Sequence, residues 1–370
     1  MKTVGGPPFR IDVPALVVMF LLIGIGMVMV YSSSVEVAKV RFNSPSLFLG
    51  KQAARLLLAF VFFYLALNID YHWFAEHYKV FLGITAVLLL ILLVSHNIMV
   101  IKGAKRWINL FGMTIQPSDL ARLSLIIYMA RMLSRNERIL QDGGWEGLLT
   151  VLSVPFAVCL LILLQPNFST VAILSMLVFT MAFAGGMRMR HVLTLALVAV
   201  PVAAFALLQT PYRLARVKAF LDPVNQAGAY QGLQSLIGLG SGGLWGVGLG
   251  ESSQKLLYLP EPFTDFVFSI LGEEFGFVGV SVVFLLFALL LYRGFIIANR
   301  AQDKLGYYLA LGITVSLGLY LFIHAGVVST LLPTTGIPLP FVSYGGSNLL
   351  FNMIAMGILL NISGQRKARS

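Results

Sequence analysis

The chain has 370 residues, of which 58% are hydrophobic and only 11% are charged, and its formal net charge at pH 7 is +11. The mean hydropathy is +0.87. This composition excludes an ordinary soluble globular domain, in which about 25% of residues are charged, and it indicates a polytopic membrane protein. The single cysteine, Cys159, excludes an intramolecular disulfide.

Apolar runs predict ten transmembrane helices, since a helix needs about 20 residues to cross the hydrocarbon. The runs are Val13–Tyr31, Ala54–Asn68, Val80–Val94, Leu120–Leu133, Leu148–Leu164, Thr170–Ala184, Val192–Leu208, Val278–Tyr292, Leu309–Val328 and Phe341–Ile362. The first run is too long for a signal-peptide core, so we expect it to remain as an anchor. The prediction is an all-α polytopic membrane protein with a single integral-membrane domain over residues 1–370.

The distribution of basic residues predicts the orientation of these helices. An even number of spans places both termini on one side, and Lys and Arg are more frequent in cytoplasmic connections. Basic residues at both termini and in alternate connections, among them Arg131, Arg135 and Lys304, share a side that is predicted to be cytoplasmic. The bias is modest, because two connections on the other side are also basic.

The connection of residues 209–264, between the seventh and eighth spans, is predicted to be long and extracytoplasmic, and loops of this length are usually functional. It begins with Arg213, Arg216 and Lys218, which suit headgroup anchoring and ligand binding equally well. A glycine-rich stretch, residues 238–250, follows. Such backbone suits a loop that folds over a substrate or offers amides to a phosphate, but it lacks the Gly-Lys-Ser/Thr ending of a nucleotide-binding loop.

Asp265 lies at the end of this connection, in the run Leu259-Pro-Glu-Pro-Phe-Thr-Asp-Phe. A carboxylate held near hydrocarbon is costly and is usually functional. The local pattern by itself favours a plain helix start, in which Thr264 caps the helix and Asp265 occupies the first turn, where the helix dipole favours an ionised carboxylate. Glu273 and Glu274 follow one or two helical turns later.

A second polar cluster covers residues 102–110 and 116–122. Asp119 and Arg122 are three residues apart, so they share a helix face and are predicted to form a structural ion pair. Lys105 and Arg106, beside Trp107, suit either an anion contact or a belt at the membrane interface.

The third cluster, residues 331–347, contains three prolines and three glycines. These residues forbid a plain helical hairpin, and irregular backbone at membrane depth persists only where it is packed or lines a cavity. We therefore predict a polar cavity here, with His324 facing the same interior as a packing residue.

Several of these stretches together resemble one family. They are Gly-Ala-Lys-Arg-Trp-Ile-Asn, Gln-Pro-Ser-Asp-Leu-Ala-Arg, Gln165-Pro, Phe220-Leu-Asp-Pro, Gly-Ser-Gly-Gly-Leu, Tyr-Leu-Pro-Glu-Pro-Phe-Thr-Asp-Phe, Gly-Glu-Glu-Phe-Gly and Pro-Leu-Pro-Phe-Val-Ser-Tyr-Gly-Gly-Ser. In order and spacing they are similar to the SEDS proteins of bacterial shape, elongation, division and sporulation, from the first span to the last. The chain is closer to the division members than to the elongation members. It departs from the pattern at Asp119 and Arg122, where Glu and Lys are usual, and at Phe263, where His is frequent.

The resemblance implies a peptidoglycan glycosyltransferase. Such an enzyme polymerises lipid II, an undecaprenyl-pyrophosphate-linked disaccharide pentapeptide, at the outer face of the bacterial cytoplasmic membrane. Asp265 is then the general base, and the candidates for holding the pyrophosphate are Lys105, Arg106, Arg213, Arg216 and Lys255. Glu261 and Ser343 are further candidate substrate contacts. A divalent cation, Mg²⁺ or Mn²⁺, is compatible with the task, but the sequence offers no ligand cluster for it. The implied partner is a class B penicillin-binding protein, a single-span transpeptidase.

Two other functions suit the same composition. A lipid flippase also needs many spans and a polar interior, and Asp265, Glu273 and Glu274 would then relay protons. A non-catalytic scaffold for a partner synthase would tolerate the loss of Asp265. Formation of glycan chains from lipid II separates the enzyme from both alternatives.

Overall fold

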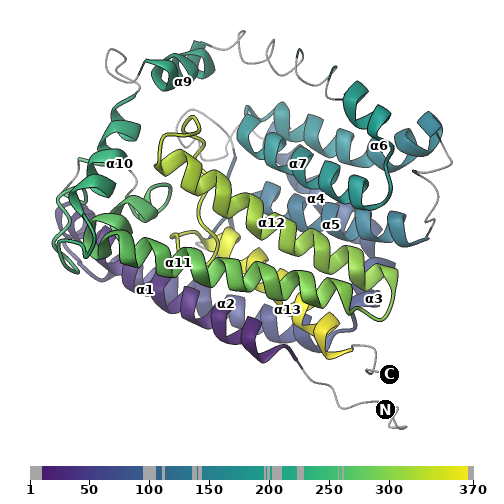
Figure 1. Cartoon of the computed structure of the whole chain (residues 1–370), viewed down its shortest axis with the longest axis horizontal. Helices are drawn as coiled ribbons and strands as arrows, with labels where there is room; N and C mark the ends of the chain where they lie inside the picture. The colour runs from purple at the N-terminus through teal and green to yellow at the C-terminus, as the bar shows by residue number, and fades with distance from the viewer. Residues whose placement is uncertain are drawn as a thin grey trace.

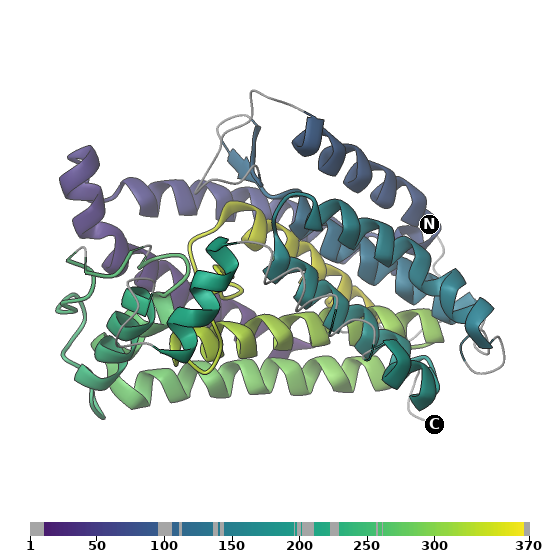
Figure 2. The same cartoon turned by 90° about the horizontal axis from the view of Figure 1, so that it is seen from above.

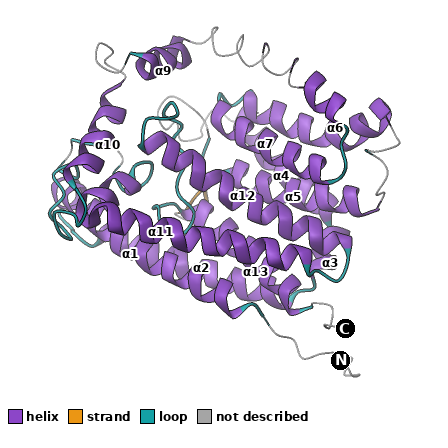
Figure 3. Ribbon diagram, in the orientation of Figure 1, coloured by secondary structure: helices purple, strands orange, loops and turns teal. Residues whose placement is uncertain are grey.

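The computed structural model describes residues 11–94, 106–110, 113–135, 140, 144–195, 197, 201, 211–222, 229–256, 258–260 and 262–365, without the side chains of residues 110, 113 and 211–213. Helices make up most of it (Figure 3). The elements are α1 (Val13–Phe42), α2 (Leu47–Asn68), α3 (Tyr71–Glu76), α4 (Tyr78–Val94), β1 (Ile108–Leu110), β2 (Met113–Ile115), α5 (Pro117–Arg135), α6 (Gly144–Leu163), α7 (Phe168–Ala184), α9 (Pro211–Leu221), α10 (Tyr230–Ser241), α11 (Val267–Asn299), α12 (Lys304–Val328) and α13 (Gly346–Gly364).

The long helices lie roughly alongside one another (Figure 1). The helix α13 packs along α2, α11 packs against α1 and α12, and α5 packs against α4 and α12. Seen from above, α4 and α11 lie at opposite sides of the assembly (Figure 2). The core helices are α12 and α13, which are 72% and 94% buried over their most apolar windows, whereas the same windows of α2 and α11 are only 22% buried. The exposed apolar faces of α2 and α11 are those expected of helices in contact with lipid.

Among the described residues, six helices are long and apolar enough to cross a membrane: α1, α2, α6, α11, α12 and α13. Two shorter apolar helices, α4 and α7, correspond to the third and sixth predicted spans. The predicted fourth span corresponds to α5, which is buried along most of its length. Most of the predicted seventh span, Val192–Leu208, lies outside the described residues, so the count of ten stays a prediction.

One end of the helix assembly joins the start of α1 to the ends of α11 and α13. The backbone N–H of Asp12 donates to Ser363 Oγ at 2.9 Å, and the carboxylate of Asp12 pairs with Arg293 at 2.6 Å. The short helix α3 lies at the same end, because Tyr71 N–H donates to the side chain of Asn361. We call this the terminal end. The opposite end, where α1 stops and α11 and α13 begin, carries the irregular segments 242–266 and 329–345, and we call it the loop end.

The helix boundaries correct several predictions. The predicted eighth span begins at Val278, but α11 begins at Val267 and continues through a kink at Gly276, where φ is +65° and ψ is −163°. The antiparallel hairpin of β1 and β2, with Ile108 opposite Ile115, was not predicted. Its strands have three residues each, too few for a periodic pattern to identify them.

The glycine-rich loop explains how the kink in α11 is tolerated. A kink frees backbone groups that must find other partners. The loop supplies these partners: the N–H groups of Val247 and Gly248 donate to the carbonyls of Glu273 and Glu274, and the N–H groups of Phe277 and Val278 donate to the carbonyls of Gly243 and Leu244. A Cβ atom at Gly246 would lie 2.1 Å from the carbonyl oxygen of Glu274, so this contact requires glycine.

Candidate active site at the loop end

The candidate site is centred on Asp265, in the turn that precedes α11. The helix begins at Val267 with Phe266 as its N-cap, so the prediction that Asp265 occupies the first turn of a helix capped by Thr264 is wrong. The side chain of Asp265 is half-buried. It faces Gly336, where a Cβ atom would lie 3.4 Å from Oδ2 of Asp265. Gly336 has φ of +72°, a conformation that favours glycine, so the chain passes close to the carboxylate without a side chain between them.

Two basic side chains hold the segment around Gly336 in place. Arg216 of α9 donates from Nη1 to the carbonyl of Thr334 at 2.7 Å. His324 of α12, which is buried, lies with Nδ1 2.8 Å from the carbonyl of Ile337. Because a carbonyl only accepts, Nδ1 carries the proton in this contact. The third polar cluster of the sequence thus forms one wall of the site, and His324 is the packing residue that was predicted.

Aromatic rings and an arginine form the neighbouring wall. The rings of Phe48, Phe263 and Tyr344 lie with centroids 4.8 to 5.5 Å apart, and Tyr344 N–H donates to the carbonyl of Phe263. The guanidinium of Arg55, on α2, lies 4.7 Å from the centroid of the Tyr344 ring.

Arg55 is a further site candidate, one that was not predicted from the sequence. It is 9% exposed, and its Nη1 has no hydrogen-bond partner within the described part of the chain. A buried cation without an anionic partner is costly, so such a group suggests a site for an anion. A signal was present in the sequence: Gln52 and Arg55 fall on the same helical face as Ala59, Phe63 and Ala66, which are buried.

Lys255 is predicted to hold pyrophosphate, and the structure contradicts this prediction. Its side chain is 5% exposed, it donates to the carbonyl of Gly250, and Nζ lies 3.3 Å from Oε1 of Glu274, whose side chain is fully buried. The same oxygen accepts a hydrogen bond from Ser32 of α1. Lys255 therefore fastens the glycine-rich loop to α1 and the kink of α11, and its charge is already neutralised there.

The two glutamates of α11 have similar structural roles. Glu273 accepts hydrogen bonds from the hydroxyls of Ser252 and Ser253 and from the backbone N–H groups of Ser253 and Gln254. The idea that the glycine-rich loop offers its amides to a phosphate is also wrong for Val247 and Gly248, whose N–H groups are bonded to α11. These hydrogen bonds hold the loop against the kinked part of α11.

Asp119, Arg122 and Ser343 make hydrogen bonds within the protein. The carboxylate of Asp119 accepts from Ser347 at 2.7 Å and Arg122 donates to Asn352 at 3.0 Å, so the predicted ion pair is not a direct contact between the two described side chains. Ser343 is buried, and its hydroxyl accepts from Leu339 N–H, so it closes a turn instead of contacting substrate. Arg106 donates to the carbonyl of Pro166 at the loop end.

Three predicted substrate-binding groups cannot be placed. Lys105, Glu261 and the side chain of Arg213 lie outside the described residues.

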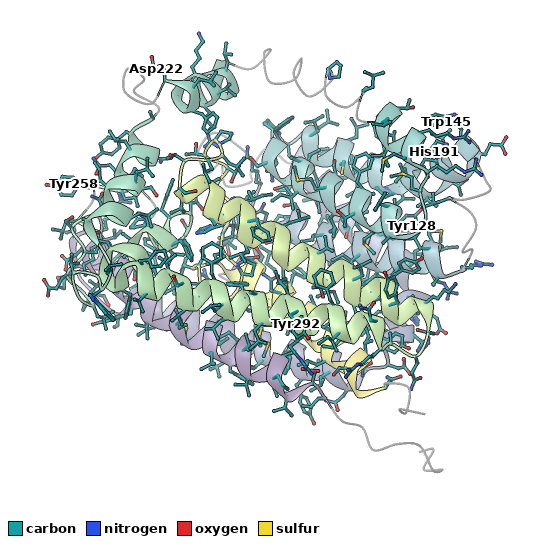
Figure 4. The ribbon with its side chains drawn as sticks, in the orientation of Figure 1. Tyr128, Trp145, His191, Asp222, Tyr258 and Tyr292 are labelled. Carbon is teal, nitrogen blue, oxygen red and sulfur yellow. The ribbon has the colours of Figure 1, made fainter. Side chains whose placement is uncertain are left out.

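The side-chain view separates the two ends of the molecule. Asp222 at the end of α9 and Tyr258 lie far from Trp145 and His191, which belong to the terminal end (Figure 4). Within the described chain, no three His, Cys, Asp or Glu side chains come together in a way that would hold a metal ion. The loop end therefore presents the half-buried carboxylate of Asp265, several basic side chains and an aromatic wall.

The fold and this site define a polytopic helical membrane protein with a carboxylate site at one end of its helix assembly. A family model described as cell cycle protein, for FtsW, RodA and SpoVE, matches residues 14–368. The chain belongs to this family, as the resemblance to SEDS proteins predicted.

Named relatives cover nearly the whole chain. It is 40% identical over 357 residues to a probable peptidoglycan glycosyltransferase FtsW of Geobacter sp. (strain M18), covering 95% of this chain and 96% of the relative. It is 36% identical over 354 residues to stage V sporulation protein E of Bacillus subtilis (strain 168), with the same coverage.

Solved structures share the fold. A chain from a peptidoglycan synthase complex that coordinates polymerization and crosslinking superposes with a TM-score of 0.78 at 25% identity, covering 96% of this chain and 98% of that one. The rod shape determining protein RodA of Thermus thermophilus superposes with a TM-score of 0.72 at 25% identity, covering 97% and 99%.

Proposed function

We propose that this protein is a peptidoglycan glycosyltransferase that polymerises lipid II at the outer face of the bacterial cytoplasmic membrane, with Asp265 as the general base. The observation that carries the proposal is the half-buried carboxylate of Asp265 against Gly336, between an arginine-held segment and an aromatic wall. The names of the relatives support the reaction.

The proposed topology has ten spans, cytoplasmic termini and an extracytoplasmic connection of residues 209–264. Two features support it: the start of α1 and the end of α13 share one end of the molecule, and α9 and α10 accompany the opposite end. The site would then face the compartment where glycan strands are assembled.

The chemistry requires one base and several cations. The oxygen of an acceptor 4-hydroxyl forms a bond to the anomeric carbon of the donor, and the bond from that carbon to pyrophosphate breaks. Asp265 takes the hydroxyl proton, a contribution worth about 10² to 10⁴ in rate. Undecaprenyl pyrophosphate leaves with the bonding electrons, and the α-linked donor becomes a β-1,4 product by a single inversion.

The leaving pyrophosphate needs positive charge, which arginine supplies well. We propose Arg216, Arg106 and Arg55 for this task, together with Lys105 and Arg213, whose side chains lie outside the described part. Glu261, which also lies outside it, is negatively charged and stays a proposed substrate contact away from the pyrophosphate. Lys255 is no longer a candidate. The proposed mechanism routes no step through a divalent cation.

The proposed partner is a class B penicillin-binding protein. A structural relative belongs to a peptidoglycan synthase complex that couples polymerization to crosslinking, which supports such a pairing. The exposed apolar faces of α2 and α11 offer lipid-side surface for a single-span partner.

The test is a gel assay of glycan chains made from lipid II by the purified protein, with and without a co-purified class B penicillin-binding protein. We expect Asp265→Asn to lower polymerisation by about 10² to 10⁴ while expression and melting temperature stay unchanged. The matched control is Glu251→Gln, an exposed carboxylate of the same connection, which should retain activity. Normal chains from Asp265→Asn would reject the base assignment, and lipid II movement without chains in wild type would favour the flippase.

A further inference from the structure

A second polar site lies at the terminal end, opposite Asp265. The last turn of α5, the first turn of α12 and the short helix α3 enclose a surface pocket of about 460 Å³. This volume is within the range of small-molecule sites, roughly 300 to 1,000 Å³. The polar side chains that line it are His72, Arg131, Ser134, Arg135, Asp303 and Lys304.

The pocket contains more basic side chains than the helix dipoles account for. Arg131 and Arg135 are one turn apart on α5, and neither guanidinium has a hydrogen bond or ion pair within the described chain. A cation in the last turn of a helix complements its dipole, which explains Arg135 alone. The dipole does not explain why Lys304, from a different helix, lines the same pocket.

The carboxylate of Asp303, which lines the pocket, already has hydrogen-bond partners within the protein. Asp303 caps α12 by accepting from Gly306 N–H at 2.8 Å, and its carboxylate also contacts Tyr71 Oη at 3.0 Å and His72 Nε2 at 2.8 Å. The other ring nitrogen of His72 lies 2.6 Å from Asp70. Both carboxylates therefore already have hydrogen-bond partners, whereas the guanidinium groups of Arg131 and Arg135 have none among the described side chains and are available to a ligand in the pocket.

The pocket lies where a membrane surface would be. One of its walls is the start of α12, a candidate membrane span, and another is α3, which connects the end of α2 to the start of α4. Trp73 of α3 is 43% exposed and stacks on His77 at 4.5 Å. Exposed tryptophan is enriched at the headgroup level of membranes.

We propose that this pocket binds the phosphate group of an anionic membrane lipid. Two arginines one turn apart can each form a bidentate contact with phosphate oxygens, and basic pockets between transmembrane helices are known to take phosphorylated headgroups. The lipid would hold α3, α5 and α12 together at the end of the molecule away from the reaction. The proposal does not depend on the activity assigned to Asp265.

The experiment measures lipid binding by the purified full chain in neutral detergent, by melting temperature and by native mass spectrometry. The probes are phosphatidylglycerol, phosphatidylcholine and inorganic phosphate. We expect phosphatidylglycerol to raise the melting temperature and to bind at least about tenfold more tightly than phosphatidylcholine, which corresponds to about 1.4 kcal/mol.

The variant that tests the pocket is Arg131→Ala with Arg135→Ala, which should lose this preference about tenfold or more, while the two lysine substitutions at the same positions should retain part of it. The control is Arg188→Ala with Arg190→Ala, an exposed arginine pair that follows α7 toward the same end. Equal losses in both pairs, or no preference in wild type, would overturn the proposal. If inorganic phosphate binds as tightly as phosphatidylglycerol, the proposal that the bound phosphate group belongs to a lipid is rejected.

Discussion

At the scale of single residues, the sequence identified the central carboxylate but not what surrounds it. Asp265 was predicted because a polar residue after a long connection is conspicuous in an apolar chain. Gly336 and Arg55 contact the same region from segments that are distant in sequence, and no local pattern brings them together. Lys255 shows the converse error: a basic residue in a predicted outer loop is buried against Glu274 in the fold.

Gly336→Ala tests whether the approach of backbone to Asp265 matters. An alanine at φ of +72° costs roughly 1–2 kcal/mol, and its methyl group would lie against the carboxylate. We expect a melting temperature lowered by a few degrees and lipid II polymerisation lowered about tenfold or more, measured in the gel assay.

Gly144→Ala is the matched control, since Gly144 also has positive φ, +54°, and a Cβ atom there meets nothing within 4 Å. It should show the stability loss without the loss of activity. Equal activities of the two variants would mean that the space beside Asp265 is not used.

At the scale of elements, the kink of α11 and the glycine-rich loop form one unit. Apolar periodicity predicts a helix from Val278, and it misses the turns before Gly276 because Gly272, Glu273 and Glu274 interrupt the apolar run. The glycine-rich loop was predicted to fold over a substrate or to offer amides to a phosphate. Its actual partner, the open backbone of a kinked helix, depends on dihedral angles that composition does not specify.

Gly276→Ala tests this unit. A Cβ atom at this position would lie 2.4 Å from the backbone nitrogen of Gly246 and 2.5 Å from the carbonyl oxygen of Leu244, so the loop or the helix must move. We expect a loss of stability of at least about 3 kcal/mol, seen as aggregation in size-exclusion chromatography and a lower melting temperature. Gly24→Ala, in the exposed face of α1 with nothing within 4 Å, should be neutral or slightly stabilising. A Gly276→Ala protein that does not aggregate and keeps the wild-type melting temperature would show that the kink is dispensable.

The contact between α3 and α12 predicts a dependence of stability on pH. Partial burial acts to lower the pKa of His72, but its hydrogen bonds to Asp70 and Asp303, together with their charges, outweigh burial and raise that pKa. A raised pKa in the folded protein means that the stabilisation is present below the ordinary value of about 6.5 and is lost as pH rises through the raised value. The melting temperature gap between wild type and His72→Gln should therefore be larger at pH 6 than at pH 9, in detergent without anionic lipid. Asp70→Asn should reduce this difference, and a gap that does not change with pH would contradict the explanation.

At the scale of the whole molecule, the helical class and most of the spans follow from hydropathy. Hydropathy alone does not give the packing order, because α12 and α13 are less apolar than α1 and α11 and yet form the interior. The buried polar residues of α13, such as Asn348 and Asn352, mark it as a core helix only once the partners of Arg122 and Asp119 are known.

The proposed orientation is testable with single cysteines. In a Cys159→Ala background, Leu249→Cys is exposed at the loop end and Gln302→Cys is exposed at the terminal end. We expect a membrane-impermeant maleimide to label the first and not the second in intact spheroplasts, and both after lysis. Labelling of Gln302→Cys in intact cells would reverse the proposed topology.

The candidate site collects Arg55, Arg216, Asp265, Gly336 and Tyr344, which are spread from the second helix to the segment just before the last one. Its final wall is therefore synthesised late, and α13 must still pack along α2 before Arg55 and Tyr344 are held together. A chain still emerging from the ribosome has no complete site. Under the proposed function, a half-made chain would therefore lack the complete site that acts on lipid II.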